Sequence, residues 1–236
     1  MNFLDFLASI AHGFVRAVQE ATPLMLEGTK FTIFVSICSI VIGIVIGLIT
    51  CLFRISHIGA LRGLAGAYIW VVRGTPMIVQ AFFIHFGVTQ LIAAFIPGFR
   101  LTAVESGIIT VSLNAGAYLA EIFRGGINSV PKGQSEAARS LGLTYGKTMR
   151  KVILPQAVKI SIPAMVNQFI ITIKDTSILS VIGLQELTNK TKIYVGATYN
   201  QFAAWAYAGL FYLVIISVLM LISRKVEASL SYERKN

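Results

Sequence analysis

The sequence predicts an all-α, polytopic membrane protein with five transmembrane helices, an N-terminal helix in the membrane interface and a cytoplasmic helical loop. The first observation behind this prediction is composition. Of the 236 residues, 56% are hydrophobic, and the mean hydropathy of +0.76 exceeds what the core of a soluble domain requires. The second is that uncharged runs extend over residues 31–53, 74–99 and 193–223. About 20 apolar helical residues cross a bilayer core, so each run is long enough to span it.

Residues 1–21 are predicted to form an amphipathic helix. A signal peptide is not expected, because charged residues interrupt the apolar stretch and no small-residue cleavage site follows. Polar and apolar residues each recur three or four positions apart, which places them on opposite helix faces. We expect this helix to lie in the membrane interface; the alternative is a helix that binds a partner. The polar face comprises Asn2, Asp5, Ser9, His12, Arg16 and Gln19, and the apolar face Phe3, Leu7, Ile10, Phe14 and Val18.

The transmembrane domain is expected at residues 22–224. The second of its five spans is long enough to contain a break, for which Gly74, Pro76 and Gly87 are candidate positions. In the first span, Gly43 and Gly47 form a GxxxG pair, a spacing that lets two helices approach closely. The spans are expected near residues 28–53, 64–97, 101–123, 160–182 and 202–223.

The distribution of Lys and Arg predicts the orientation. Thirteen of them lie in the loop that directly follows the first span, in the long loop 124–159 or in the C-terminal segment, and five lie on the opposite flanks. The positive-inside rule therefore places loop 124–159 and the tail 225–236 in the cytoplasm and the N-terminus outside. The same rule accounts for the net charge of +10, so no nucleic-acid partner is predicted.

Loop 124–159 is predicted to begin with a short helix. This helix contains Glu136, Ala137 and Ala138 and ends at Gly142, a residue suited to the left-handed conformation found at helix ends. The two alanines would let another surface approach closely, and Glu136 would offer a carboxylate to an arginine. The alternative is a plain surface loop whose cations serve only membrane topology.

A second, basic helix is expected in the same loop, from a cap at Thr144 to Pro155. Residues 142–148 (GLTYGKT), which include the beginning of this helix, look like a nucleotide-binding P-loop. This segment has three residues between its glycines, however, where a P-loop needs four. The chain is therefore predicted to have no ATP site of its own. No metal site is predicted either, because the histidines lie in separate segments without suitable neighbouring ligands.

Charged residues within the fourth span are candidates for function. Lys174 and Asp175 lie about 22 Å along this span. Since adjacent helical residues point in different directions, each charge must find a partner or a water-filled cavity. With the hydroxyl groups of Thr176 and Ser177, these side chains either line a translocation pathway or form an internal ion pair.

Polar residues in other spans extend this set of candidates. Arg73, followed closely by Thr75, either extends to the cytoplasmic face or lies beside a helix break whose backbone groups line a cavity. Asn114 and Gln168 lie nearer mid-depth. Each of these amides either contacts a polar solute or forms a hydrogen bond between helices.

Several segments together resemble one family. These are residues 72–80 (VRGTPMIVQ), 117–124 (AYLAEIFR), 133–139 (GQSEAAR), 174–177 (KDTS) and 181–183 (VIG). Over roughly residues 22–224, the chain resembles the membrane (permease) subunit of bacterial polar amino-acid ABC importers. Within that family it is similar to the histidine/glutamine/arginine permease group of type I importers, whose EAA motif corresponds to Glu136–Ala138.

The resemblance implies the partners. Two permease subunits, either two copies or one copy with a sister chain, would form the pore in a bacterial inner or plasma membrane. Two cytoplasmic ABC ATPase subunits would bind ATP and Mg²⁺, and an extracytoplasmic solute-binding protein would deliver a polar amino acid. The helix at Glu136–Gly142 would dock into the ATPase, so this chain would need no cofactor and would not itself be an enzyme. Glutamine, glutamate, arginine, histidine and cystine all remain candidate solutes.

Two other functions stay open at this point. An ion-coupled secondary transporter usually contains internal repeats over ten or more spans, and this sequence shows five spans without an evident repeat. A non-transporting membrane subunit, acting in assembly or sensing, would use the basic loop to bind a different cytoplasmic partner.

Overall fold

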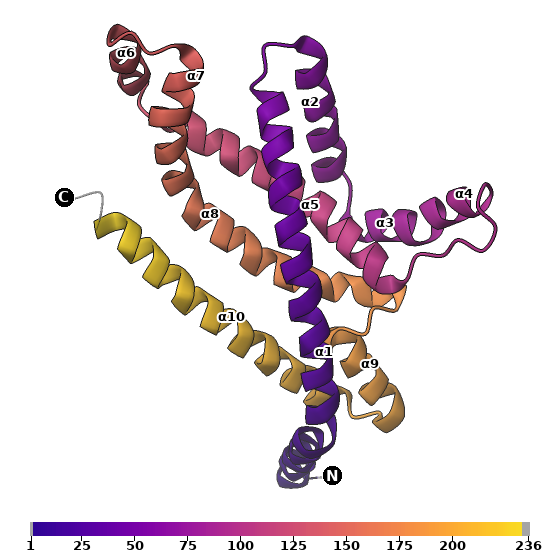
Figure 1. Ribbon diagram of the computed structural model, residues 1–236. Helices are drawn as coiled ribbons and strands as arrows, with labels where there is room; N and C mark the ends of the chain where they lie inside the picture. Colours follow the sequence, from indigo (N-terminus) through magenta and orange to yellow (C-terminus); the bar gives the residue numbers. More distant parts are fainter. Residues whose placement is uncertain (1, 233–236) are drawn as a thin grey trace. The chain divides into compact units, whose positions relative to one another are not determined.

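The structure is a computed structural model that describes residues 2–232, with the side chains of Phe3, Leu4, Phe6 and 226–232 not described. Residues 233–236 of the predicted tail lie outside this part. Within it the chain is helical and forms no strand (Figure 1), which confirms the predicted fold class. The α-helices are α1 (Phe3–Arg54), α2 (Gly59–Gly74), α3 (Met77–Phe82), α4 (Thr89–Ala93), α5 (Ala103–Asn128), α6 (Lys132–Ser140), α7 (Tyr145–Thr148), α8 (Leu154–Asp175), α9 (Leu187–Thr198) and α10 (Gln201–Tyr232).

Shorter helical turns of other types join some of these helices. Two π-helical segments, η1 (Phe83–Val88) and η2 (Met149–Ile153), continue into α4 and α8, and a 3-10 segment, η3 (Thr176–Ile182), follows α8. Among residues 2–232, four helices are long and apolar enough to cross a membrane: Leu7–Arg54, Ala103–Asn128, Tyr145–Ile182 and Gln201–Lys225. If the bent pair of α2 with Met77–Ala93 is counted as one broken span, the number is five, which is the number that the sequence predicts.

The chain forms two compact units. The first unit comprises Met1–Cys38, Met77–Val111 and Thr172–Met220, and the second comprises Ser39–Pro76, Ser112–Ile171 and Leu221–Asn236. The long helices α1, α5, α8 and α10 contribute to both units, so the units are divided along helices rather than at a linker.

In the first unit, small side chains of α1 pack closely against α9 and α10. Ala17, Ala21 and Met25 are fully buried in a cluster with Leu187 and Tyr194 of α9 and with alanines of α10. The approach is closest at Gly28, where an added Cβ atom would lie 2.8 Å from the Cα atom of Leu187. The apolar face predicted for residues 1–21 is only partly the buried one, because Leu7 and Val18 are exposed.

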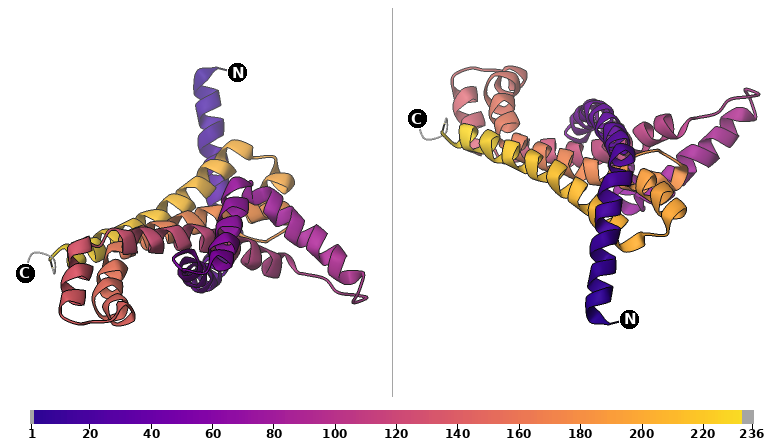
Figure 2. Two further views of the ribbon diagram at one scale, coloured as in Figure 1. Left: turned by 90° about the horizontal axis from the view of Figure 1, so that it is seen from above. Right: turned by 90° about the horizontal axis from the view of Figure 1, so that it is seen from below.

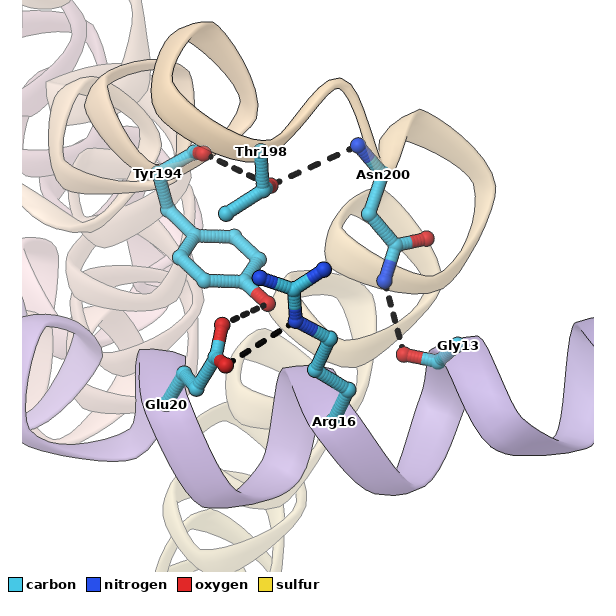
Figure 3. A network of polar contacts seen from close by, with 6 residues as sticks. All are labelled: Gly13, Arg16, Glu20, Tyr194, Thr198 and Asn200. Carbon is cyan, nitrogen blue, oxygen red and sulfur yellow. Dashed lines mark hydrogen bonds and ion pairs between the residues drawn. The ribbon is translucent and has the colours of Figure 1, made fainter.

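The polar face of the same segment also contacts protein (Figure 3). Arg16 Nε donates to Glu20 Oε1 at 2.9 Å, and Tyr194 of α9 donates its hydroxyl to Glu20 Oε2 at 3.2 Å. The Asn200 side chain donates to the Gly13 carbonyl at 2.7 Å. These contacts hold the start of α1 against the segment that joins α9 to α10.

The predicted boundary after residue 21 is not a helix end, because α1 continues from Phe3 to Arg54. Instead, α1 changes direction within its N-terminal part (Figure 2). Pro23 lies inside the helix, where it removes one backbone hydrogen bond, and this is a usual cause of a helix bend. Packing against α9 and α10 favours continuation of the helix over a break.

Glu186 fixes the start of α9. Its carboxylate is fully buried and accepts hydrogen bonds from the backbone N–H groups of Thr188 and Asn189 at 2.8 and 2.7 Å. The Tyr212 hydroxyl donates to it at 3.0 Å. Burial raises the pKa of Glu186, while the N–H donors and Tyr212 act in the opposite direction and partly offset that effect.

We expect the protein to lose stability as the pH rises through the pKa of Glu186. Because the folded pKa is raised above its ordinary value of 4.5, the folded state binds the proton more tightly than the unfolded state in the interval between the two. Within that interval, each pH unit lowers the free energy of unfolding by up to about 1.4 kcal/mol. Thermal unfolding in detergent, measured from about pH 4.5 upward, should show a smaller slope for Glu186→Gln than for the wild type. An unchanged slope would contradict this prediction, and the exposed Glu136→Gln is the control.

In the second unit, α5 lies close to both α1 and α8. Added Cβ atoms on Gly43 and Gly47 would lie 3.1 and 2.8 Å from the Cβ atoms of Ala115 and Leu119, so the predicted GxxxG face is confirmed as a helix contact. On α5, Gly126 allows a similar approach to α8, where an added Cβ would lie 2.8 Å from the Ala157 carbonyl oxygen. Tyr68 of α2 donates its hydroxyl to the Leu113 carbonyl at 2.6 Å.

The predicted break in the second span occurs at Thr75 and Pro76. Helix α2 ends at Gly74 and α3 begins at Met77, since a proline disfavours helical geometry in the preceding residue. The third candidate position, Gly87, is not a break but lies inside the π-helical segment η1. There the backbone hydrogen-bond pattern changes while the chain stays helical.

Pro155 does not end the basic helix of loop 124–159, contrary to the prediction. Helices α7, η2 and α8 follow one another without interruption from Tyr145 to Asp175, and Pro155 is the second residue of α8. A proline lacks the N–H group that a regular helix requires. The π-helical turn η2, directly before Leu154, provides the local change in hydrogen bonding that accommodates it.

Candidate functional site

The loop between α5 and α8 forms a helix–turn–helix within the second unit. Helix α6 ends at Ser140, and Gly142 adopts a left-handed backbone conformation with φ +81°. The N–H of Leu143 donates to the Ala138 carbonyl at 3.1 Å and that of Gly142 to the Arg139 carbonyl at 2.9 Å. This is the Schellman arrangement that glycine favours, so the predicted helix end at Gly142 is confirmed.

Helix α7 begins directly after Thr144. Thr144 has the extended backbone of a capping residue, but its side chain makes no capping hydrogen bond. Only the position predicted for this cap is therefore confirmed. The Thr144 carbonyl accepts a hydrogen bond from the N–H of Thr148 at 2.9 Å. The first turn of this helix is therefore closed by a backbone hydrogen bond and not by a side-chain cap.

The exposed surface of the turn combines a carboxylate with apolar side chains. Glu136 and Ala137 are exposed, and so are Leu141 at 84% and Tyr145 at 56%. We call Glu136, Ala137, Leu141 and Tyr145 the coupling surface, after the role that the sequence analysis predicts for this turn. Ala138 is only 6% exposed, so it packs inside the turn, and Ala137 is the alanine that stays open to another surface. Leu141 and Tyr145 were not among the predicted site residues, although large apolar residues in a polar loop were a signal for them.

A small core anchors the coupling surface to the long helices. Val130, Ile153 and Ala157 are buried together, and Ile127, Met149 and Val152 pack against them. These residues come from the end of α5, the segment after it, η2 and α8. The His57 ring also lies 6.2 Å from that of Tyr145. A force on the turn would therefore reach α5 and α8 through packed side chains.

A cavity of about 460 Å³ lies elsewhere in the second unit. Arg73 places its guanidinium 4.8 Å from the ring centroid of Tyr118, a cation–π distance. Glu121 forms a bidentate ion pair with Arg124 at 3.1 and 2.5 Å. We call this cavity the arginine pocket. It is lined by Arg54, Gly66, Ile69, Trp70, Arg73, Gly74, Tyr118 and Glu121.

The other predicted pathway residues of the second unit are Thr75, Asn114 and Gln168. The Thr75 hydroxyl donates to the Val71 carbonyl at 2.8 Å. Asn114 on α5 is 8% exposed and Gln168 on α8 is 4% exposed. Of the four candidates in this unit, only Arg73 lines the arginine pocket. The pocket residues Arg54, Tyr118 and Glu121 were not predicted, because nothing in the sequence indicates that α1, α2 and α5 meet there.

The remaining predicted pathway residues belong to the first unit, where α8 gives way to η3. Lys174 is exposed and Asp175 is half-buried, and within the part of the chain that the structure describes they form no ion pair with each other. The hydroxyls of Thr176 and Ser177 donate to the carbonyls of Ile173 and Lys174 at 2.7 and 2.6 Å. These hydroxyls therefore cap the end of α8.

The described residues contain no group of three or more His, Cys, Asp or Glu side chains arranged to hold a metal ion. What they do contain is a bundle of apolar helices, a helix–turn–helix with an exposed coupling surface, and a cavity with basic groups on its wall. These features define a multi-pass membrane transport subunit.

The comparisons with known proteins identify the family. Residues 31–232 match the family described as "Binding-protein-dependent transport system inner membrane component", and the chain belongs to it. The Bacillus subtilis arginine transport system permease protein ArtQ is 37% identical over 96% of this chain and 97% of its own length. The Escherichia coli K12 glutamine transport system permease protein GlnP is 38% identical over 89% of this chain and 94% of its own.

Solved structures of ABC transporters have the same fold as this chain. A crystal structure of an amino acid ABC transporter with histidines has a TM-score of 0.85 at 36% identity, covering 92% of this chain and 98% of that one. An inward-facing structure of the MetNI methionine ABC transporter has a TM-score of 0.74 at 18% identity, over 89% and 97% of the two chains. At that lower identity, the likeness shows the fold alone. The relatives are permease subunits, which are not themselves catalytic.

Proposed function

We propose that this chain is the pore-forming permease subunit of an ATP-driven importer for polar amino acids. A partner ATPase hydrolyses ATP, and the coupling surface transmits the resulting motion to the pore. The observation that carries the proposal is the coupling surface itself. Leu141 and Tyr145 are large apolar side chains exposed at 84% and 56%, beside a carboxylate and on a turn closed by two backbone hydrogen bonds, as expected of a protein-binding surface.

The proposed mechanism is mechanical. The ATPase binds α6 and α7, burying Leu141 and pairing Glu136 with a basic group. When two ATPase subunits close on ATP and Mg²⁺, they move this turn. Because α7 continues through η2 into α8 and the core around Ile153 joins the turn to α5, the motion reaches the spanning helices. This chain contributes no catalytic residue to ATP hydrolysis.

The proposed topology places the coupling surface in the cytoplasm and the N-terminus outside, in a bacterial inner membrane. The excess of Lys and Arg in loop 124–159 supports this orientation. A second permease subunit, identical or a sister chain, completes the pore. A solute-binding protein docks on the opposite side and delivers the amino acid.

The proposed solutes are polar amino acids, since relatives of this chain are named for arginine, glutamine and L-cystine transport. The polar residues proposed to line the pathway are Arg73, Thr75, Asn114, Gln168, Lys174, Asp175, Thr176 and Ser177.

The test is reconstitution of the full chain in vesicles with its ATPase and solute-binding protein. Uptake of radiolabelled L-glutamine or L-arginine is expected only when ATP and all protein components are present. The control contains the same vesicles with a non-hydrolysable ATP analogue. Uptake that proceeds without ATP and follows an imposed ion gradient would contradict the proposal and favour a secondary transporter.

A further inference from the structure

The arginine pocket contains more positive charge than its own residues neutralise. Glu121 is the acidic residue on its wall, and both carboxylate oxygens of Glu121 are held by Arg124. Arg54 and Arg73 line the same cavity, and neither forms an ion pair within the described residues. Arg73 is exposed and Arg54 is half-buried, and two like charges beside one cavity repel each other, so an anion between them would relieve that repulsion.

Arg73 is also held in place before any ligand arrives. Its guanidinium lies 4.8 Å from the Tyr118 ring centroid, and the helix that carries it ends one residue later, at Gly74. A side chain that is already ordered loses less conformational entropy on binding. The planar guanidinium group also presents paired N–H donors that match the two oxygens of a carboxylate or phosphate group.

From these observations we infer that Arg54 and Arg73 form a binding site for an oxyanion group, a carboxylate or a phosphate, in the arginine pocket. The volume of about 460 Å³ lies within the usual range for small-molecule sites. Ile69 and Trp70 supply apolar wall beside the two arginines, so the group belongs to a molecule that also carries an uncharged part. Two sources share this chemistry, the α-carboxylate of an amino acid and the phosphate of a lipid headgroup.

The inference deepens the proposed function, because Arg73 is also proposed to line the solute pathway, and it identifies a ligand class for the cavity that contains Arg73. It does not depend on ATP-driven transport, because binding is measured on the full chain without ATPase, ATP or solute-binding protein. Failure of the uptake experiment and failure of this inference are therefore separate results.

The pocket contains its own optical probe. The chain has two tryptophans, and one of them, Trp70, is on the pocket wall. Trp205 belongs to α10 in the other unit. In a Trp205→Phe background, the intrinsic fluorescence reports on Trp70 alone. The protein is the purified full chain in nanodiscs of zwitterionic phosphatidylcholine.

In the solute arm, L-arginine and L-glutamine are titrated, with agmatine as the matched compound that lacks the carboxylate of arginine. If the α-carboxylate is the ligand, at least one amino acid changes the Trp70 fluorescence saturably and agmatine does not. Arg54→Gln and Arg73→Gln each weaken binding by about tenfold or more. Arg73→Lys, which keeps the charge but loses the paired donors, weakens binding less.

In the lipid arm, nanodiscs containing anionic phosphatidylglycerol are compared with those of phosphatidylcholine alone. If lipid phosphate is the ligand, the Trp70 spectrum differs between the two lipids, and Arg54→Gln and Arg73→Gln remove the difference. Arg62→Gln, an exposed arginine of α2 outside the pocket, is the control in both arms and should behave as the parent protein. Each variant is checked for native helix content by circular dichroism.

Either arm supports the inference when its signal depends on both Arg54 and Arg73. The inference is overturned if neither solutes nor lipids change the Trp70 signal. It is equally overturned if the change persists in correctly folded Arg54→Gln and Arg73→Gln proteins, or if Arg62→Gln abolishes the change to the same extent.

Discussion

Replacing Glu136 by Ala together with Gly142 by Asp is expected to lower ATP-dependent uptake by roughly tenfold or more. Glu136 is the carboxylate of the coupling surface, and its loss removes the predicted ion pair with the ATPase. Gly142 has φ +81°, a conformation that carries some cost for any residue with a side chain, and Gly142→Asp also adds a negative charge to the turn between Leu141 and Tyr145. Uptake is measured in vesicles that also contain the ATPase and the solute-binding protein.

Two further proteins separate a coupling defect from a folding defect. Gly142→Asn should retain more uptake than Gly142→Val, because asparagine tolerates the left-handed conformation and a β-branched residue does not. Gly125→Ala, at an α5 position with open space around it, should transport as the wild type does. If the double variant binds the ATPase and transports normally, the coupling role of this surface is wrong.

Gly28→Ala is expected to be the most destabilising single methyl addition in the first unit. The new Cβ would lie 2.8 Å from the Cα atom and 2.9 Å from the N atom of Leu187. These are backbone atoms, and they cannot move aside easily because Leu187 and Glu186 are both fully buried. Overpacking of this kind costs about 1–3 kcal/mol, so the thermal unfolding midpoint in detergent should fall by several degrees.

Gly196→Ala is the matched control for this prediction. Gly196 lies in α9 with no atom within 4 Å of an added Cβ, so the same substitution should be neutral or slightly stabilising, because alanine favours a helix over glycine. If Gly28→Ala unfolds at the same temperature as Gly196→Ala, the close contact between α1 and α9 is not present in the protein.

The sequence was sufficient for features that depend on local chemistry. The apolar runs predict the spanning helices because backbone polar groups must be satisfied within a lipid core. Gly142 predicts a helix end because glycine lacks the Cβ atom that disfavours positive φ. Pro76 predicts the break of the second span for an equally local reason. Pro155 was misjudged, because a π-helical turn can absorb the missing hydrogen bond and the sequence does not indicate one.

The sequence could not group residues that lie far apart along the chain. Arg54, Arg73 and Glu121 come from three helices, and the packing of α1, α2 and α5 decides that they share one cavity. In the same way, exposure distinguishes Ala137 from Ala138, although both belong to the same motif. Tertiary packing buries one and leaves the other open.

By itself, then, the sequence determined that this protein is a multi-pass helical membrane protein. It also determined that a basic loop of this protein is helical and that the first helix of the loop ends at Gly142. Hydropathy, charge and backbone conformation are properties of short segments, and they do not require knowledge of the neighbours. The tertiary structure alone decided that Leu141 and Tyr145 complete the coupling surface, that Glu186 is a buried helix cap, and that Arg54 and Arg73 line one pocket. Burial and proximity depend on which helices meet, and no single segment contains that information.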